Sequence, residues 1–195
     1  MHGDMRPLEV GALQVVRRPK TKDADATVDE RDFLYIDMSK LEPGQYSRES
    51  GCRAFWYIFQ SILEDEQVQR RGLIVVAYLA HFSNKNRDPT FARMCIGMMQ
   101  GCLPIQMSGF HVCYAPPLFR LAARVLFLFM SERLRKRIVS HNNSSGSSGN
   151  CCCEQVNSLL GSKYGIPRRL LPTDMGGELK LDIRTWLAER HAAGL

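Results

Sequence analysis

The residues that could do covalent chemistry are scattered along this 195-residue chain and form no recognised catalytic motif. Cys113 is followed by Arg120, one residue too far for the Cys-x5-Arg arrangement of cysteine-dependent phosphatases. His81 and His111 lie on or beside apolar runs, where a histidine is more often a core or edge residue than a base. The sequence also lacks serine-nucleophile, phosphate-loop, dinucleotide and zinc-protease motifs. These observations predict a protein that is not an enzyme and has no metal site.

Three consecutive cysteines, Cys151–Cys153, follow a tract of Asn, Ser and Gly at Asn142–Asn150. This composition is typical of a flexible loop, and we interpret 142–153 as a loop insertion. Palmitoylation or metal binding is the alternative for the three thiols, although consecutive cysteines do not easily reach one metal ion. The N-terminus lacks the apolar segment of a secretory signal, and the seven cysteines lack disulfide-scaffold spacing. We therefore expect reduced thiols and a cytoplasmic location.

A cationic cluster at 133–137 is the most specific charged feature, in a chain whose net charge is +6. It contains Arg133, Arg135, Lys136 and Arg137. One interpretation is a solvated helix end, where cations are favoured by the helix dipole. The other is a cationic collar at the mouth of an apolar cavity, with Arg133, Arg135 and Lys136 contacting a phosphate or an anionic membrane surface.

The segment that precedes this cluster, 118–130, predicts a helix that is apolar on nearly all sides. Six residues share one helical face by their spacing: Leu118, Phe119, Ala122, Val125, Leu126 and Phe129. Leu121, Ala123, Phe127, Leu128 and Met130 cover much of the rest. A helix that only covers a sheet needs a single apolar stripe. The second apolar side therefore needs a partner domain, a membrane or an apolar ligand.

The elements that must position this helix alternate between strands and helices. We expect strands at 13–16, 31–38, 72–79, 109–114 and 138–140. The helices are expected at 47–69, 88–101, 118–130, 132–137, 154–161 and 179–193. This alternation predicts an α/β layered domain with a mostly parallel sheet and helices on its faces. We interpret 1–32 as an irregular N-terminal segment and 33–195 as the domain. The longest apolar run, Val125–Met130, is too short to span a membrane.

Several segments together resemble the CRAL-TRIO lipid-binding domain, over roughly residues 33–177. Gly72–Leu79 is similar to the apolar central strand of that family. Leu103-Pro104 and then Phe110–Phe119, with Ala115-Pro116, resemble the strand that ends in an Asn-Ala-Pro-like turn before the gate region. Met130–Ile138 resembles the segment that closes the gate helix. Ile166-Pro167 and Leu171–Gly177 resemble the Leu-Pro-x-x-x-Gly-Gly ending.

The resemblance implies a sheet floor and a gate helix, 118–130, that closes a pocket for one hydrophobic lipid. Its function would be non-enzymatic lipid binding and intermembrane transfer, with no cofactor other than the lipid. The implied ligand-binding residues are Leu118, Phe119, Ala122, Val125, Leu126, Phe129 and Arg137. We expect a monomer that contacts anionic membranes transiently and peripherally, and that binds no nucleic acid. The alternative is a protein-interaction module whose pocket is filled or closed.

The sequence departs from the phosphatidylinositol-transfer members of that family at several positions. Ile105 and Gln106 stand where those members carry an acidic residue and a base, and Leu134 stands in place of a threonine. Arg137 alone stands at the basic headgroup position. The resemblance therefore implies a generic phosphate headgroup or a neutral lipid. The helical N-terminal module usual in the family is not visible in 1–32.

Overall fold

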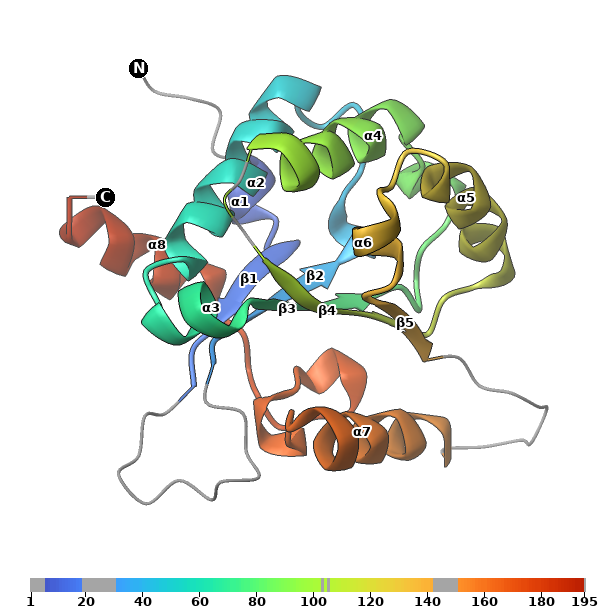
Figure 1. The fold of residues 1–195 in the computed structure, drawn as a ribbon. Coiled ribbons are helices and arrows are strands. Elements are labelled where there is room, and N and C mark those ends of the chain that lie inside the picture. Colours follow the sequence, from blue (N-terminus) through green and yellow to red (C-terminus); the bar gives the residue numbers. More distant parts are fainter. Residues whose placement is uncertain (1–5, 19–30, 103, 105, 142–150, 195) are drawn as a thin grey trace.

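The computed structural model describes residues 6–18, 31–102, 104, 106–141 and 151–194, without the side chains of 151–153. Its centre is a five-stranded sheet in the order β1-β2-β3-β4-β5 (Figure 1). The strands are β1 (Leu13–Val16), β2 (Phe33–Asp37), β3 (Leu73–Tyr78), β4 (Met107–Cys113) and β5 (Ile138–His141). β1 pairs antiparallel with β2, and the other pairs are parallel. The predicted mostly parallel α/β sheet is therefore confirmed.

The sheet order explains why most helices lie on one face. Strands β2 to β5 are added side by side in sequence order, so the right-handed rule for parallel crossovers sends every connecting helix to the same side. Figure 1 shows this layer, with α2, α4, α5 and α6 above the sheet and α7 below it. Side chains alternate accordingly: Leu34, Ile36, Val75 and Ala77 belong to the upper core, whereas Phe33, Tyr35, Ile74 and Val76 belong to the lower one.

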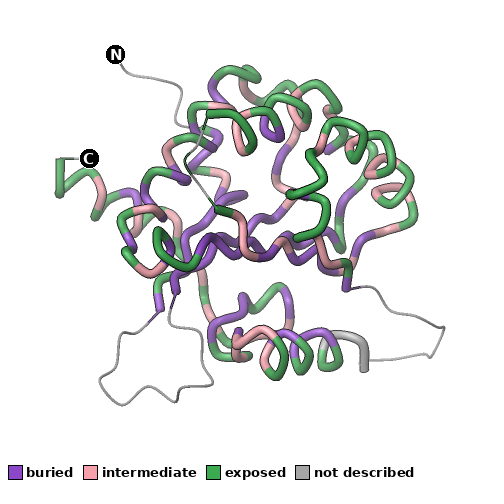
Figure 2. The backbone as a smooth tube through the Cα atoms, viewed as in Figure 1, coloured by how far each residue is buried: buried purple, intermediate pink, exposed green. Residues whose placement is uncertain are grey.

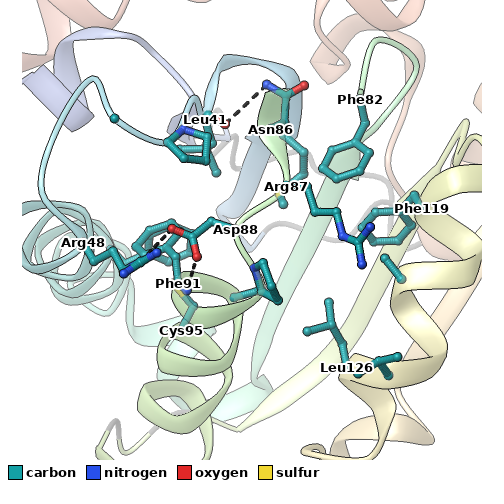
Figure 3. Close-up of a pocket in the computed structure, with 18 of the residues that line it drawn as sticks. Leu41, Arg48, Phe82, Asn86, Arg87, Asp88, Phe91, Cys95, Phe119 and Leu126 are labelled. Carbon is teal, nitrogen blue, oxygen red and sulfur yellow. Dashed lines mark hydrogen bonds and ion pairs between the residues drawn. The ribbon is translucent and has the colours of Figure 1, made fainter. Parts of the chain in front are cut away.

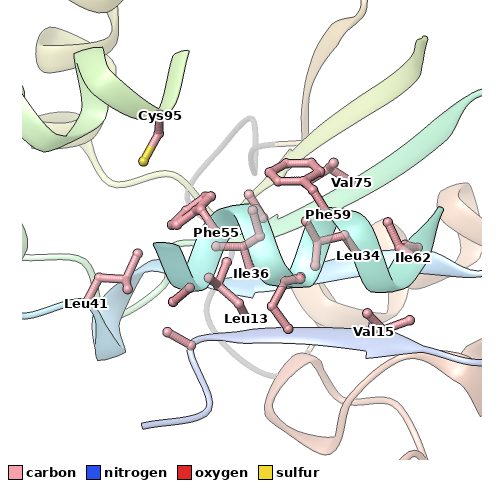
Figure 4. Close-up of a cluster of buried hydrophobic side chains, with 14 of the residues drawn as sticks. Leu13, Val15, Leu34, Ile36, Leu41, Phe55, Phe59, Ile62, Val75 and Cys95 are labelled. Carbon is pink, nitrogen blue, oxygen red and sulfur yellow. The ribbon is translucent and has the colours of Figure 1, made fainter. Parts of the chain in front are cut away.

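The upper layer is built on α2 (Arg48–Ile62), which packs directly on the sheet. Ser47 caps it by accepting a hydrogen bond from the Ser50 N–H. Phe55, Phe59 and Ile62 are buried against the strands (Figure 4). The predicted single helix at 47–69 is wrong, because α2 ends at Ile62 and α3 (Glu66–Arg71) follows. Buried Asp65 separates them, since its carboxylate accepts from the N–H groups of Gln67 and of Asp32, across the core.

The lower layer comes from the C-terminal part of the chain. Helix α7 (Cys151–Tyr164) and the short turns Arg168–Leu170 and Thr173–Met175 cover the other face of the sheet. The Gly176-Gly177 pair closes this segment, since Gly176 has φ +76° and a Cβ on Gly177 would lie 2.0 Å from the Leu171 carbonyl oxygen. That crowding is a physical reason for the Leu-Pro-x-x-x-Gly-Gly ending. Helix α8 (Ile183–Ala192) packs beside α1 (Arg6–Glu9).

Two predicted boundaries differ from the structure. Residues before the predicted division at 33 also join the core, because α1 and β1 contribute buried Leu8, Leu13 and Val15 to the same core as β2. The apolar segment Leu13–Val16 is only four residues long. Its pairing with β2, which is distant in the sequence, therefore decides where it lies in the fold. The expected loop insertion 142–153 overlaps α7, whose helical backbone already begins at Cys151. Residues 142–150 lie outside the described part of the chain.

Candidate functional site: an apolar cavity beneath helix α5

Helix α5 (Pro117–Phe127) follows β4 through a turn at Tyr114, whose φ is +58°. Pro116 and Pro117 set its start, because a proline is preorganised for the first turn of a helix. The predicted extent of 118–130 is wrong at its end, since Leu128–Met130 form turns before Ser131 caps α6 (Glu132–Arg135). None of the eleven residues of α5 is buried, although most of them are apolar. The helix therefore contacts the core only in part, as through Phe119, whose ring centre lies 5.3 Å from that of Phe82.

The space under α5 is a cavity of about 450 Å³. Its floor is the upper face of the sheet, through residues such as Ile36, Ala77 and Val112. Helix α4 (Pro89–Gly97) forms one wall, and α5 and α6 form the roof and the far side. Alanines line each of these parts, at Ala77, Ala92, Ala115 and Ala123. Small side chains on several elements leave the space open.

A second cavity of about 360 Å³ adjoins the first, toward the loop between β3 and α4. The two share part of their lining, namely Met38, Phe55, Ala92, Cys95, Phe119 and Leu126. The second cavity carries more polar groups, which Figure 3 shows along the β3–α4 loop and at Arg48 on α2. The Arg48 guanidinium donates to the Asp88 carboxylate at 2.7 Å. The combined space is thus apolar at one end and partly polar at the other.

Titratable groups in the cavity wall are held in definite protonation states. Burial alone would raise the pKa of Asp88, but hydrogen bonds from Arg48 and from the Phe91 N–H outweigh it and lower the pKa. The hydrogen bond that the Cys95 thiol donates to Cys52, and then burial, raise the pKa of the Cys95 thiol far above its usual range. Burial, with the nearby Cys95 and Asp88, raises the pKa of Tyr46 to about 12. Cys95 and Tyr46 are therefore neutral at physiological pH, and Asp88 is charged but paired.

The structure distributes the residues predicted to bind a ligand over several environments. Phe119 and Leu126 line both cavities, whereas Ala122 and Val125 line only the smaller one. Leu118 and Phe129 lie outside the lining of both. Phe129 leaves the helical face because α5 ends before it, and the Arg93 guanidinium lies 4.8 Å from its ring centre.

The cationic cluster lies on the outer surface beside the cavities. Arg137 is exposed and outside both linings, and its backbone carbonyl accepts from the Phe110 N–H. Arg133 and Arg135 are also exposed, and Lys136 pairs with Glu132 at 2.6 Å. Buried Leu134 is the α6 residue that lines the larger cavity. The four cations thus stay predicted surface contacts, and their side chains do not line the cavities.

The residue-spacing argument missed a second stripe of α5 that faces the larger cavity. Phe119, Ala123, Leu126 and Phe127 follow the same helical period, displaced from the predicted stripe, and Met130 lines the same cavity from the turn after α5. Arg120 and Arg124 also line this cavity with part of their length. The signal was present in the sequence, but a helix that is apolar all round does not reveal which stripe faces inward.

The remaining reactive side chains lie elsewhere. His111 and His141 stack on the lower face, with 3.0 Å between Nδ1 and Nε2 and with Tyr164 against both rings. Burial and then His141 lower the pKa of His111 to about 4. His81 is exposed in the turn after β3, beside Tyr78, and Cys113 is buried on the lower face. Among the described residues there is no group of three or more potential metal ligands.

In the described part of the chain, none of the helices has the length and apolar character needed to cross a bilayer.

A family model described as the CRAL/TRIO domain matches residues 26–161. The chain belongs to the CRAL/TRIO domain family. The human alpha-tocopherol transfer protein-like protein is 25% identical over 150 residues, covering 75% of this chain and 40% of that protein. Human clavesin-2 is 25% identical over 160 residues, covering 80% of this chain and 45% of that protein. The predicted family is thus confirmed.

The CRAL/TRIO fold is also found among solved structures. The crystal structure of Sfh5 matches with a TM-score of 0.60 at 12% identity, covering 97% of this chain and 70% of that one. Human tyrosine-protein phosphatase non-receptor type 9 is 21% identical over 134 residues, which is 69% of this chain but only 20% of that protein. The chain spans less than half the length of these curated relatives.

Proposed function

We propose that this CRAL/TRIO domain binds a single hydrophobic lipid in the cavity beneath α5 and transfers it between membranes. The observation that carries the proposal is an apolar eleven-residue helix, none of whose side chains is fully buried, that roofs a cavity of about 450 Å³. Ligand pockets in proteins commonly measure about 300–1,000 Å³ and are mostly apolar. Each methylene of a bound lipid would contribute about 0.8 kcal/mol by leaving water. A lipid is therefore the occupant that best accounts for the position of α5.

The side chains under α5 favour this function over an interaction module with a filled pocket. Bulky side chains throughout would be needed to close the space, yet the floor contains Ala77 and Val112 beside the larger Ile36, and Ala92 forms part of the wall. The name of one relative refers to transfer of alpha-tocopherol, a hydrophobic molecule of this size class. The proposal needs no catalytic group, no metal and no cofactor beyond the bound lipid.

In this proposal α5 is a gate, and one side chain from the segment after α4, Gln100, holds the turn that follows it. The Gln100 amide donates to the Phe129 carbonyl at 3.0 Å and accepts from the Ser131 N–H. Gln100→Ala should therefore speed lipid exchange severalfold while leaving stability nearly unchanged, because exposed hydrogen bonds contribute little. Gln69→Ala is the matched control, since Gln69 makes a similar exposed bond to the Leu63 carbonyl far from the gate. Equal lipid exchange rates in the two variants would show that Gln100 does not hold the gate.

The outer side of α5 supports a membrane-facing role for the gate. Leu121 and Leu128 are 64% and 78% exposed, and Val125, which also lines the smaller cavity, is exposed beside them. Arg133, Arg135 and Arg137 lie exposed in the segment that follows. An exposed apolar stripe flanked by cations is typical of a surface that contacts anionic lipid. We propose peripheral membrane contact here; docking of a protein partner is the second candidate function, favoured by the same exposed stripe.

Two leucine substitutions on α5 test lipid binding. Leu126 lines both cavities, so Leu126→Asp places a charge in an apolar space and should abolish bound lipid. Leu121→Asp is the matched control, because Leu121 is exposed on the same helix and lines neither cavity. The measurement is lipid per protein by mass spectrometry of organic extracts after detergent-free purification, with circular dichroism to check folding. A wild-type protein that carries no lipid and takes none from vesicles would refute the proposal.

A further inference from the structure

The smaller cavity has a polar mouth formed by consecutive residues of the β3–α4 loop. Asn86, Arg87 and Asp88 line it, together with Arg48 from α2 (Figure 3). The larger cavity, by contrast, is lined by hydrocarbon over most of its surface. A ligand that fills both spaces would therefore have a polar group at this mouth and an apolar body beneath α5.

Most polar groups at the mouth already have partners. Asp88 accepts from Arg48 at 2.7 Å and from the Phe91 N–H at 3.0 Å. The Asn86 amide donates to the carbonyl of Ser39 at 2.7 Å, and its oxygen accepts from the Ser83 N–H at 3.0 Å. The Arg87 guanidinium has no side-chain hydrogen bond or ion pair within the described residues. It points toward α5, beside Phe119 (Figure 3).

Arg87 is held in place by its two neighbours. Asn86 is buried and anchors the loop to the segment after β2, while Asp88 caps α4 and pairs with Arg48. The backbone of Arg87 is thus fixed on both sides while its guanidinium remains available. A guanidinium presents a planar fork of donors that matches the oxygens of a carboxylate or phosphate. Arg48 and Asp88 cancel in charge, so the mouth keeps one net positive charge.

We propose that the ligand of this domain is a lipid with a single acid headgroup, which Arg87 binds at the polar mouth while its hydrocarbon chain lies beneath α5. This inference rests on the proposed function and adds the chemical class of the ligand. The headgroup is a carboxylate or a phosphate monoester, because both offer two coplanar oxygens to the guanidinium. Arg120 and Arg124 are the competing cations, but they lie on the proposed gate helix, whereas Arg87 lies on a loop anchored to the sheet layer.

The experiment compares an acid and a neutral probe with the same hydrocarbon chain. The delipidated full chain is titrated with cis-parinaric acid and with its methyl ester, and the fluorescence gives both dissociation constants. Wild type should bind the acid about tenfold or more tightly than the ester, as expected for one charge-assisted hydrogen-bonded contact. Arg87→Gln should weaken the acid to the level of the ester and leave the ester unchanged.

Matched variants and competitors separate the possible causes. Lys85→Gln removes the same charge from an exposed position two residues away that lines neither cavity, and should change neither constant. Oleate and oleoyl lysophosphatidate, but not inorganic phosphate, should displace the acid probe, and the stronger competitor identifies the headgroup. Equal affinities for acid and ester in wild type, or an effect of Arg120→Gln or Arg124→Gln in place of Arg87→Gln, would overturn the assignment while lipid binding stands. Failure of both probes to bind would overturn the proposed function as well.

Discussion

Helices α5 and α7 cover opposite faces of the same sheet, but only α7 packs tightly against it. Helix α7 buries Val156, Asn157 and Leu160 against the lower face, and Leu160 has no exposed surface. Helix α5 has the more apolar sequence, yet its residues are only intermediate or exposed (Figure 2). It lies above a cavity. Apolar composition alone therefore does not decide burial. A helix packs on a sheet only where the facing side chains fill the space between them.

The two faces differ in the size of the side chains that meet. On the lower face Phe33 and Tyr35 meet Leu160, Ile166 and Leu171, all of them fully buried. On the upper face beneath α5, the small residues Ala77, Val112 and Ala115 lie among larger ones such as Ile36 and Phe110. Large residues on both sides make a solid core, whereas small ones leave room for a ligand.

The largest difference between the two helices should appear in stability. Leu160→Ala should lower the free energy of unfolding by about 2–5 kcal/mol, because it opens a cavity in a packed core. Leu121→Ala on α5 should change it by no more than about 0.5 kcal/mol, since Leu121 is exposed. Urea denaturation of both variants measures the contrast. Similar losses at the two positions would mean that α5 is packed as tightly as α7.

The lower face should also make stability depend on pH. Burial lowers the pKa of His111 to about 4 and lowers that of His141, so both rings are neutral when folded near neutral pH. The unfolded chain binds protons near pH 6.5, so this contribution to stability is full above pH 6.5 and is lost as pH falls toward 4. For His111 the loss is on the order of 3 kcal/mol. Urea midpoints measured from pH 7.5 to 4.5 should fall accordingly.

His111→Gln provides the control for this pH dependence, because glutamine is polar but does not titrate. Its urea midpoint should vary less with pH between 6.5 and 4 than that of wild type, whatever its stability at pH 7.5. The same pH dependence in both proteins would show that other groups are responsible. Lys163 and Tyr164 face the pair from α7, so they belong to the same environment.

The cavity itself can be filled to make the upper face more like the lower one. Ala123→Phe places a ring in the space of about 450 Å³ and should weaken lipid binding at least tenfold. The fold should remain, because the added volume enters open space and not a packed core. Leu121→Phe on the outer side of the same helix should leave lipid binding unchanged. The measurement is bound lipid per protein, with thermal unfolding as the check. If the Ala123→Phe variant retains its bound lipid, the ligand lies outside this cavity.

The smallest expected effect concerns membrane binding by exposed arginines on the two faces of the sheet. Arg137→Glu should weaken binding to anionic vesicles by about 1 kcal/mol per charge removed, more at low salt than at high salt. Arg169→Glu, at an exposed position in the turn after α7, should have little effect, because that side lacks the apolar stripe of α5. Vesicle co-sedimentation at two salt concentrations measures both. Equal loss in the two variants would indicate non-specific attraction.

Local sequence patterns predicted most elements because their causes are local. The Gly72–Leu79 run is apolar throughout and became a central strand, and Asp88-Pro89 gave the cap and first turn of α4. Ser131 likewise caps α6. Errors arose where distant residues decide, as at Asp65, whose hydrogen bond to the Asp32 N–H helps to split one predicted helix into two.

The candidate site likewise has features that local sequence predicts and features that distant residues decide. The sequence by itself determined that the helix after β4 has more apolar surface than a sheet requires, and so that something further must cover it. Only the tertiary structure decided which stripe faces the larger cavity and that Arg87, from a distant loop, lies at the mouth of the smaller one. Helical period follows from neighbouring residues, whereas a cavity depends on the volumes of side chains from β2, β3, β4, α4 and α5 together, which no local pattern specifies.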